Sequence, residues 1–182
     1  MNAPLWQMTE WSMWAAKERE TRVVVCDPAA LLVAKPLERA LTPGAYELLH
    51  QSNEQKRVRA LLLRRRKAGA AVSVEAGEDI AIDTAAIALI APHEQQRLLA
   101  ARDRERALRT VIEAPSGSFT VPIDDGDVFG FAALVAGDGR ANTRWLLDRK
   151  KQIAALYIAL PPIDAVAVDA STILASLPPP KK

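Results

Sequence analysis

Apolar and polar residues recur mostly at helical spacing along this chain of 182 residues. The clearest case is residues 93–113, where Leu98, Leu108 and Val111 fall on one face and charged residues fill most of the rest. A spacing of three or four residues between apolar positions is typical of an amphipathic helix. The same pattern predicts further helices over residues 4–20, 45–67, 84–90, 128–136 and 141–160.

Strand-like patterns are shorter and fewer. Apolar residues alternate with polar or small ones in residues 72–74 and 80–82, on either side of Gly77, which predicts an antiparallel hairpin. Single strands are predicted from short apolar runs at residues 23–25, 119–121 and 166–168. The sequence therefore predicts an α+β fold that is mostly helical, with one or two small antiparallel β-hairpins.

Composition agrees with a helical, globular protein. Hydrophobic residues make up 49% of the chain and charged residues 25%, which excludes a disordered protein. Aromatic residues are only 5%, which favours helices over a β-sandwich, and a single cysteine excludes a disulfide framework. Apolar runs such as residues 85–91 are far shorter than the roughly 20 residues that span a bilayer. Because the first 20 residues also lack the pattern of a secretory signal, we expect a soluble, cytoplasmic protein without a membrane partner.

The first 44 residues are interpreted as an N-terminal arm with a tryptophan-rich helix. On a helical wheel, the large apolar residues of this helix spread around the whole circumference, so that it must be covered on several sides. The cover is either the chain's own core or another subunit. The expected partner-interface residues are Leu5, Trp6, Met8, Trp11, Met13 and Trp14. Residues 45–176 are predicted to form the helical α+β domain, and residues 177–182 a disordered tail.

Positive charge is concentrated in residues 56–67, although the net charge of the chain is only +2. On the predicted helix these charges point in several directions, and no aromatic residue lies among them to stack on a base. A solvated or partner-facing helix end is therefore favoured over nucleic-acid binding, which stays the alternative function. The candidate anion or nucleic-acid contacts are Arg64, Arg65, Arg66 and Lys67.

A cysteine nucleophile is the one catalytic pattern that the residue counts allow. Cys26 could pair with His50 or His93, but nothing in the sequence brings either histidine close, and a buried, inert cysteine is the favoured interpretation. The close ligand pairs of a structural zinc site are missing. The sequence also contains no glycine-rich phosphate loop. The expectation is a protein that is not an enzyme and uses no metal or cofactor.

The acidic segment Asp124-Asp125-Gly126-Asp127 is a candidate calcium-binding loop. An EF-hand loop, however, needs a bidentate glutamate at its twelfth position, and that position is Val135. The segment is therefore interpreted as an acidic turn that caps the helix predicted at residues 128–136.

The order of features from residue 64 to residue 159 resembles a domain of unknown function found in bacteriophage tail proteins, often in proteins linked to tail-fibre assembly. The resemblance rests on a basic helix end, the hairpin before Asp83-Thr84, a polar helix rich in Gln and Arg, the strand at residues 119–121 and alanine-rich paired helices. It departs from the family in the position of Gly77 and in lacking the aromatic residue before the last helices.

The resemblance implies a structural or assembly protein of a phage tail or similar particle. Such a protein would act through contacts with itself and with other virion or tail proteins, in the host cytoplasm during assembly. It would then either stay in the virion or leave as an assembly chaperone. No catalytic residue is carried over from the family. The all-round apolar N-terminal helix would supply the adhesive surface that this role needs.

Overall fold

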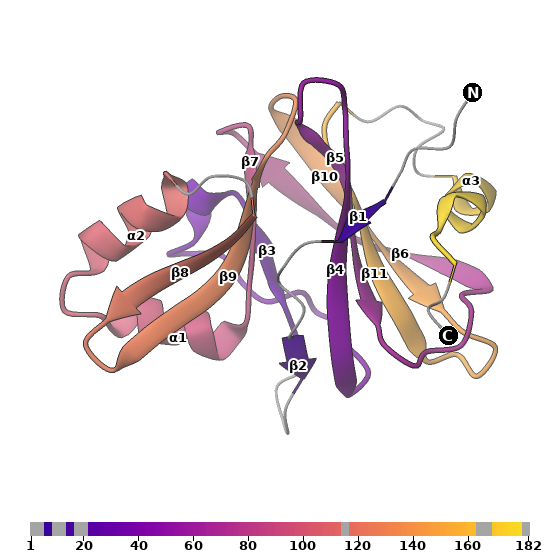
Figure 1. Ribbon diagram of the computed structural model, residues 1–182, viewed down its shortest axis with the longest axis horizontal. Helices are drawn as coiled ribbons and strands as arrows, with labels where there is room; N and C mark the ends of the chain where they lie inside the picture. The colour runs from indigo at the N-terminus through magenta and orange to yellow at the C-terminus, as the bar shows by residue number, and fades with distance from the viewer. Residues whose placement is uncertain (1–5, 9–13, 17–21, 114–116, 163–168, 180–182) are drawn as a thin grey trace.

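The computed structural model describes residues 6–8, 14–16, 22–113, 117–162 and 169–179. These residues form two antiparallel β-sheets that face each other across an apolar core, with helices on the outside (Figure 1). Strands account for 47% of these described residues and helices for 18%. The prediction of a mostly helical α+β fold is therefore wrong, and the protein is mostly β.

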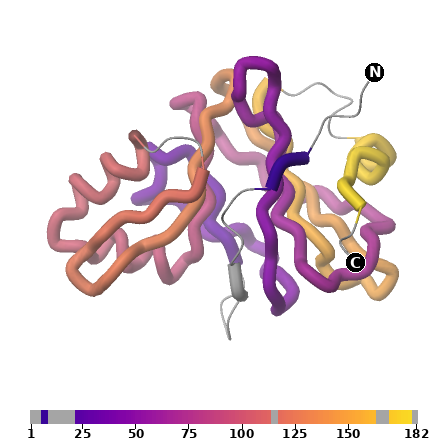
Figure 2. The backbone as a smooth tube through the Cα atoms, in the orientation of Figure 1, coloured from indigo at the N-terminus to yellow at the C-terminus, as the bar shows by residue number. Residues whose placement is uncertain are grey.

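The large sheet has seven strands in the described part of the chain. Across the sheet they run β1 (Gln7–Met8), β4 (Gly44–Ser52), β5 (Val58–Arg65), β11 (Ile153–Ala159), β10 (Gly139–Leu147) and β6 (Ser73–Ile82). The seventh strand, β2 (Trp14–Ala16), also pairs with β4. The two N-terminal strands thus share one edge of the sheet, where Figure 2 shows the indigo β1 segment beside β4.

The small sheet has the order β3 (Val24–Cys26), β7 (Ala86–Ile90), β9 (Gly126–Leu134) and β8 (Gly117–Ile123). Its outer face is covered by α1 (Pro92–Ala100) and α2 (Arg104–Ile112), with the short 3-10 helix η1 (Pro28–Ala30) nearby (Figure 1). The outer face of the large sheet carries α3 (Ala170–Ser176), whose Ile173 is buried against it. The protein is therefore a four-layer arrangement of helix, sheet, sheet and helices.

Both faces of the central strands are buried, which explains why they resembled helices in the sequence. In β5, Leu61 and Leu63 face the core between the sheets, whereas Leu62 faces the outer apolar cluster beneath α3. A strand buried on both faces reads as a continuous apolar run without alternation. The helices predicted over residues 45–67, 84–90, 128–136 and 141–160 are instead the β4–β5 hairpin, β7, β9 and the β10–β11 hairpin.

The remaining local predictions have mixed outcomes. The predicted hairpin at residues 72–74 and 80–82 is one strand, β6, with Gly77 in its middle, where a Cβ atom would lie 2.2 Å from Thr143 Oγ1. The helix predicted at residues 93–113 is confirmed, but it is divided into α1 and α2 by Asp103, which caps α2. The predicted strands near residues 23–25 and 119–121 are confirmed as β3 and part of β8, and residues 166–168 lie outside the described residues.

The Asp27 carboxylate fastens the end of β3 to the corner between β6 and β7. It accepts hydrogen bonds from the backbone N–H groups of Ala29, Asp83 and Thr84 and from Thr84 Oγ1, each 2.8 Å long. Burial would raise the pKa of this carboxyl group, but the hydrogen bonds from Thr84, Ala29 and Asp83 outweigh it, and the pKa is lowered. Asp27 is therefore held as a buried anion that links the two sheets.

Gly130 in β9 allows the Phe119 ring of β8 to lie directly over the backbone. A Cβ atom at residue 130 would be 2.3 Å from this ring. Replacing Gly130 by alanine is therefore expected to lower the free energy of unfolding by about 2 to 3 kcal/mol, because the well-packed ring has to shift. Urea unfolding measures the change.

Gly137→Ala is the matched control for this substitution. A Cβ atom there meets no described atom within 4 Å, so we expect a change below about 0.5 kcal/mol. Adding Phe119→Leu to the Gly130 variant should recover part of the loss through coupling between neighbours. Equal stability of the two glycine variants would contradict the described packing.

Candidate functional site

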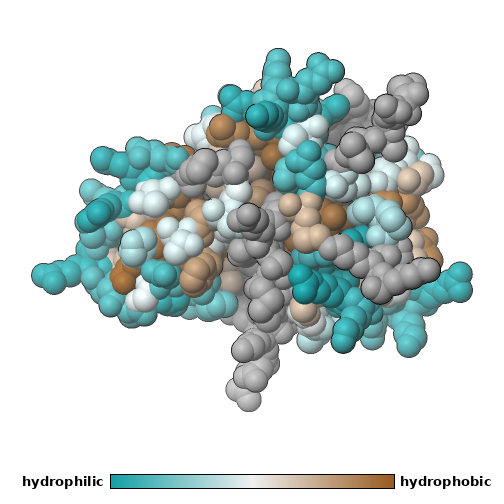
Figure 3. Space-filling view, in the orientation of Figure 1, coloured by the Kyte–Doolittle hydropathy of each residue, from teal (hydrophilic) through white to brown (hydrophobic). Residues whose placement is uncertain are grey.

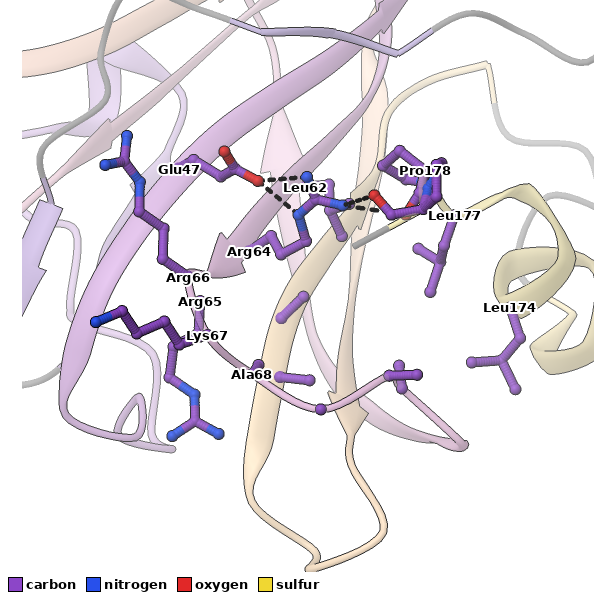
Figure 4. A pocket seen from close by; sticks show the side chains of 16 residues that line it. Glu47, Leu62, Arg64, Arg65, Arg66, Lys67, Ala68, Leu174, Leu177 and Pro178 are labelled. Carbon is purple, nitrogen blue, oxygen red and sulfur yellow. Dashed lines mark hydrogen bonds and ion pairs between the residues drawn. The ribbon is translucent and has the colours of Figure 1, made fainter. Parts of the chain in front are cut away.

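A hollow with a volume of about 610 Å³ opens on the outer face of the large sheet. It lies between the end of β5, the loop that follows it, the start of β11 and the chain after α3 (Figure 4). Its volume falls within the roughly 300–1,000 Å³ that is usual for ligand pockets. The lining residues are Glu47, Leu62, Arg64, Arg65, Arg66, Lys67, Ala68, Gly69, Ala70, Ala71, Ala154, Ala155, Leu174, Leu177, Pro178 and Pro179.

The floor of the hollow consists of small residues placed on an otherwise bulky sheet. Ala155 belongs to the outer apolar cluster of the large sheet, next to Leu62 and Tyr157. Ala154 precedes it at a β-bulge, since Leu146 pairs with Ala155 while Leu147 pairs with Ile153. Bulges re-aim side chains and are common beside functional sites. The small side chains leave room that leucine or isoleucine would fill.

Arg64 crosses one side of the hollow and joins the sheet to the C-terminal segment. Its Nε donates to Glu47 Oε1 at 2.7 Å, and its Nη2 donates to the same oxygen. Its Nη1 donates to the backbone oxygens of Pro178 at 3.0 Å and Pro179 at 3.1 Å (Figure 4). The Glu47 and Arg64 side chains are only 4% and 14% exposed. This ion pair therefore fixes the segment that forms one wall.

Trp6 supports the same wall from the N-terminal side. Its Nε1 donates to the backbone oxygen of Ser176 at 2.7 Å, and its ring meets that of Tyr157 edge-on at 6.3 Å between centroids. The Asp169 side chain caps the N-terminus of α3 by accepting from the Thr172 N–H. Trp6 thus holds the C-terminal end of α3, and the Asp169 cap stabilises the first turn of the helix.

The helix predicted over residues 4–20 is wrong where the structure describes these residues, and the partner interface assigned to it stays a prediction. Gln7–Met8 and Trp14–Ala16 are strands along β4, because the edge of a large sheet offers them backbone partners. Trp6 packs within its own chain, whereas Met8 is 44% exposed. The other predicted interface residues that lie outside the described residues are Leu5, Trp11 and Met13.

All four predicted basic contact residues line the hollow, but they differ in what they can offer a ligand. Arg64 is engaged as described, and Arg65 Nη2 lies 3.5 Å from Asp148 Oδ2. Arg66 and Lys67 are exposed, form no ion pair with the described residues and extend to one side of the floor (Figure 4). The hollow therefore has a positively charged border, formed mainly by these two residues, and their role as anion contacts stays a prediction.

The remaining basic residues of the sequence cluster lie elsewhere. Lys56 and Arg57 belong to the β4–β5 turn, which is hydrophilic at the top of Figure 3. Arg64 follows Arg57 by seven positions, a distance of about 23 Å along an extended chain. The expected basic helix is thus replaced by a hairpin that places its charges at opposite ends.

The structure gives Cys26 no catalytic environment. It lies in the apolar cluster beneath α1 and α2, where burial, with a contribution from the charge of Asp27, raises its pKa to about 12. The thiol is therefore protonated at neutral pH, as expected of an inert cysteine. His50 lies in the other sheet, where burial lowers its pKa, and the 66% exposed His93 side chain lies 3.3 Å from Glu94.

The acidic segment is a turn between β8 and β9, but it caps no helix. Arg97 of α1 donates to the backbone oxygens of Asp125 and Asp127, which fixes the turn against the helix. No group of three or more potential metal-ligating side chains occurs among the residues that the structure describes. None of the helices in this part of the chain has the length and apolar character that a membrane crossing requires.

Comparison of the chain with protein-family models, with curated proteins and with solved structures gives no match. The structure also differs from three features on which the tail-protein resemblance rested. The basic helix end is the end of β5, the hairpin is the single strand β6, and the alanine-rich paired helices are β9, β10 and β11.

Proposed function

We propose that this chain is a structural or assembly protein that acts through protein–protein contacts, with the hollow as its contact site. The observation that carries the proposal is an apolar floor beside exposed positive charge, built on a rigid sheet. Protein interfaces combine a desolvated apolar centre with a polar rim in this way. Side chains that project from sheet strands also hold a binding surface in place without induced ordering.

The hollow suits a protein segment better than a nucleic acid, the second candidate partner. None of the lining residues that the structure describes is aromatic, so a base would find no ring among them on which to stack. Among the described residues, the exposed charge of the border comes from Arg66 and Lys67, which corresponds to a salt dependence of only about two phosphate contacts. An apolar peptide side chain, in contrast, gains roughly 25 cal/mol for each Å² that the floor removes from water.

The particle in which the protein works is the part of the proposal that rests on sequence resemblance alone. We propose a phage tail or a similar particle, with further copies of this chain and other tail proteins as partners. The identity of the neighbouring genes tests this part of the proposal. Tail and baseplate genes would support a role in a tail, and an unrelated operon would contradict it.

Filling the hollow tests the contact site itself. Ala70 is an exposed lining residue, so Ala70→Trp is expected to block the floor without disturbing the core. Co-expression with the products of neighbouring genes, followed by co-purification, should give a complex with the wild type. The affinity of the Ala70→Trp variant for the same partner, measured by calorimetry, should be about tenfold lower.

Ala136→Trp is the matched control, because Ala136 is an exposed alanine in the β9–β10 connection, outside the hollow. It should bind like the wild type. If all three proteins bind the same partner equally, the hollow is not the contact site. If no product of a neighbouring gene binds the wild type, the proposed assembly role is wrong.

A further inference from the structure

We infer that the segment bound in the hollow is an extended peptide that presents an acidic side chain beside apolar ones. This inference rests on the proposed function and specifies the chemistry of the partner. Three features of the site carry it: the balance of charge, the fixed geometry of the basic turn, and the way in which the site holds the chain's own C-terminal segment.

The charges at the hollow leave two positive groups without a counter-charge among the described residues. Arg64 is paired with Glu47, and Arg65 lies next to Asp148. Of the four basic lining residues, two are therefore compensated, and Arg66 and Lys67 remain. Opposite charge across an interface selects and orients a partner. A carboxylate on the bound segment is the group that this border would recognise.

The backbone holds the two free cations in a defined place. The Arg66 N–H donates to the Ala45 oxygen at 2.7 Å, and the Ala68 N–H donates to the Arg65 oxygen at 3.3 Å. Lys67 between them has a φ of 61°, a left-handed conformation that is uncommon for a residue with a side chain. The turn is thus fixed at both sides, and binding requires little ordering of this backbone.

The chain's own tail shows which kind of segment this surface accommodates. Leu177 is extended, with φ −64° and ψ 140°, and packs against the outer apolar cluster of the large sheet. The backbone oxygens of Pro178 and Pro179 accept hydrogen bonds from Arg64. An extended segment is therefore held here by one apolar side chain and by its carbonyl groups. A partner segment beside it would place leucine or proline on the Ala154–Ala155 floor and a carboxylate at Lys67.

A random linear peptide library, selected on the wild-type protein and depleted on Ala70→Trp, tests the inference directly. The selected peptides should be enriched in Asp or Glu next to Leu or Pro. Their dissociation constants, measured by fluorescence anisotropy, should rise at least about tenfold when Arg66 and Lys67 are both replaced by glutamate. Raising the salt from about 0.1 M to about 1 M, which shortens the Debye length from about 10 Å to about 3 Å, should weaken binding as well.

Arg104→Glu with Arg109→Glu is the matched control, since both arginines are exposed on α2, far from the hollow in the fold (Figure 1). Its dissociation constants should change by less than about twofold. Thermal unfolding followed by circular dichroism verifies that each variant is folded. All substituted arginines and the lysine are exposed, so their melting temperatures should match the wild type.

The two levels of the proposal fail in different ways. Suppose that the selected peptides lose binding to Ala70→Trp, yet lack acidic residues and bind the Arg66→Glu, Lys67→Glu variant as tightly as the wild type. This result would contradict an acidic partner but would still support the hollow as the contact site. Selection that yields no peptide sensitive to Ala70→Trp would overturn both the inference and the hollow as a protein-binding site.

Discussion

Replacing Asp27 by alanine is expected to lower the free energy of unfolding by about 4 kcal/mol, the largest effect of any single substitution considered. The change removes four hydrogen bonds, to three backbone N–H groups and the Thr84 hydroxyl, at a site that is only 3% exposed. Donors left without an acceptor in such a place incur the full cost of desolvation. Urea unfolding at neutral pH measures the difference.

The pH dependence of the same variant provides an independent test. The pKa of Asp27 is lower in the folded protein than its ordinary value of 3.8. The stabilisation is therefore complete above that value and is lost as the pH falls through the folded pKa. The difference in unfolding free energy between wild type and Asp27→Ala should accordingly shrink in acid.

Asp138→Ala serves as the control for Asp27. Asp138 is exposed and accepts one hydrogen bond, from the Ala85 N–H at 3.0 Å, in the same corner of the fold. We expect it to cost about 1 kcal/mol or less. A loss for Asp27→Ala no greater than this, or one that does not change with pH, would show that the carboxylate does not link the sheets.

Replacing Arg64 by methionine is expected to cost about 3 kcal/mol of unfolding free energy. Methionine keeps much of the apolar stem, but the nearly buried Glu47 carboxylate loses its guanidinium partner. The carbonyl groups of Pro178 and Pro179 lose their donor at the same time. Hydrogen exchange of the α3 amides should therefore become faster, because local opening of this segment requires less free energy.

A double-mutant cycle with Glu47→Leu separates the ion pair from other effects. Replacing both members of a buried pair by apolar residues is often close to neutral. The double variant should therefore be more stable than Arg64→Met alone, with a coupling energy of about 1 to 3 kcal/mol. Additive losses in the cycle, or unchanged exchange in α3, would mean that the pair does not hold the tail.

The helices α1 and α2 could be predicted from the sequence because each buries a single face. Leu98 of α1 and Val111 of α2 point toward the small sheet, while charged residues on the other sides meet solvent. Strand β8 was recognisable for a similar reason, since Phe119 and Val121 are buried and Thr120 between them is exposed. An element with one solvent-exposed face has a regular spacing of apolar residues, and this spacing can be recognised in the sequence.

The central strands could not be predicted in this way. In Leu61-Leu62-Leu63 and in residues 153–160, every side chain is buried, by the opposite sheet on one side and by the outer cluster on the other. Short apolar runs of this kind have no period that separates strand from helix. Their high alanine and leucine content then favoured helix, although pairing between distant strands decides the structure.

The sequence predicts only part of the candidate site. The run from Arg64 to Lys67 was visible as charge, and the structure places all four residues at the hollow. Its floor and wall come from residues 154–155 and 177–179, which the sequence does not connect to that run. A usable signal was the placement of two alanines among large apolar residues at the start of β11, where a packed strand would carry bulkier side chains.

The hydrogen bond between Trp6 and Ser176 makes neighbours of two residues that are 170 positions apart along the chain. Shortening the protein from either direction therefore strips the same patch of the outer sheet face, and the two deletions are not independent perturbations. Because Pro178 and Pro179 line the hollow, a label attached at these positions would crowd its mouth. The β8–β9 turn, on the opposite side of the molecule in Figure 1, is the place where an attachment leaves that mouth free.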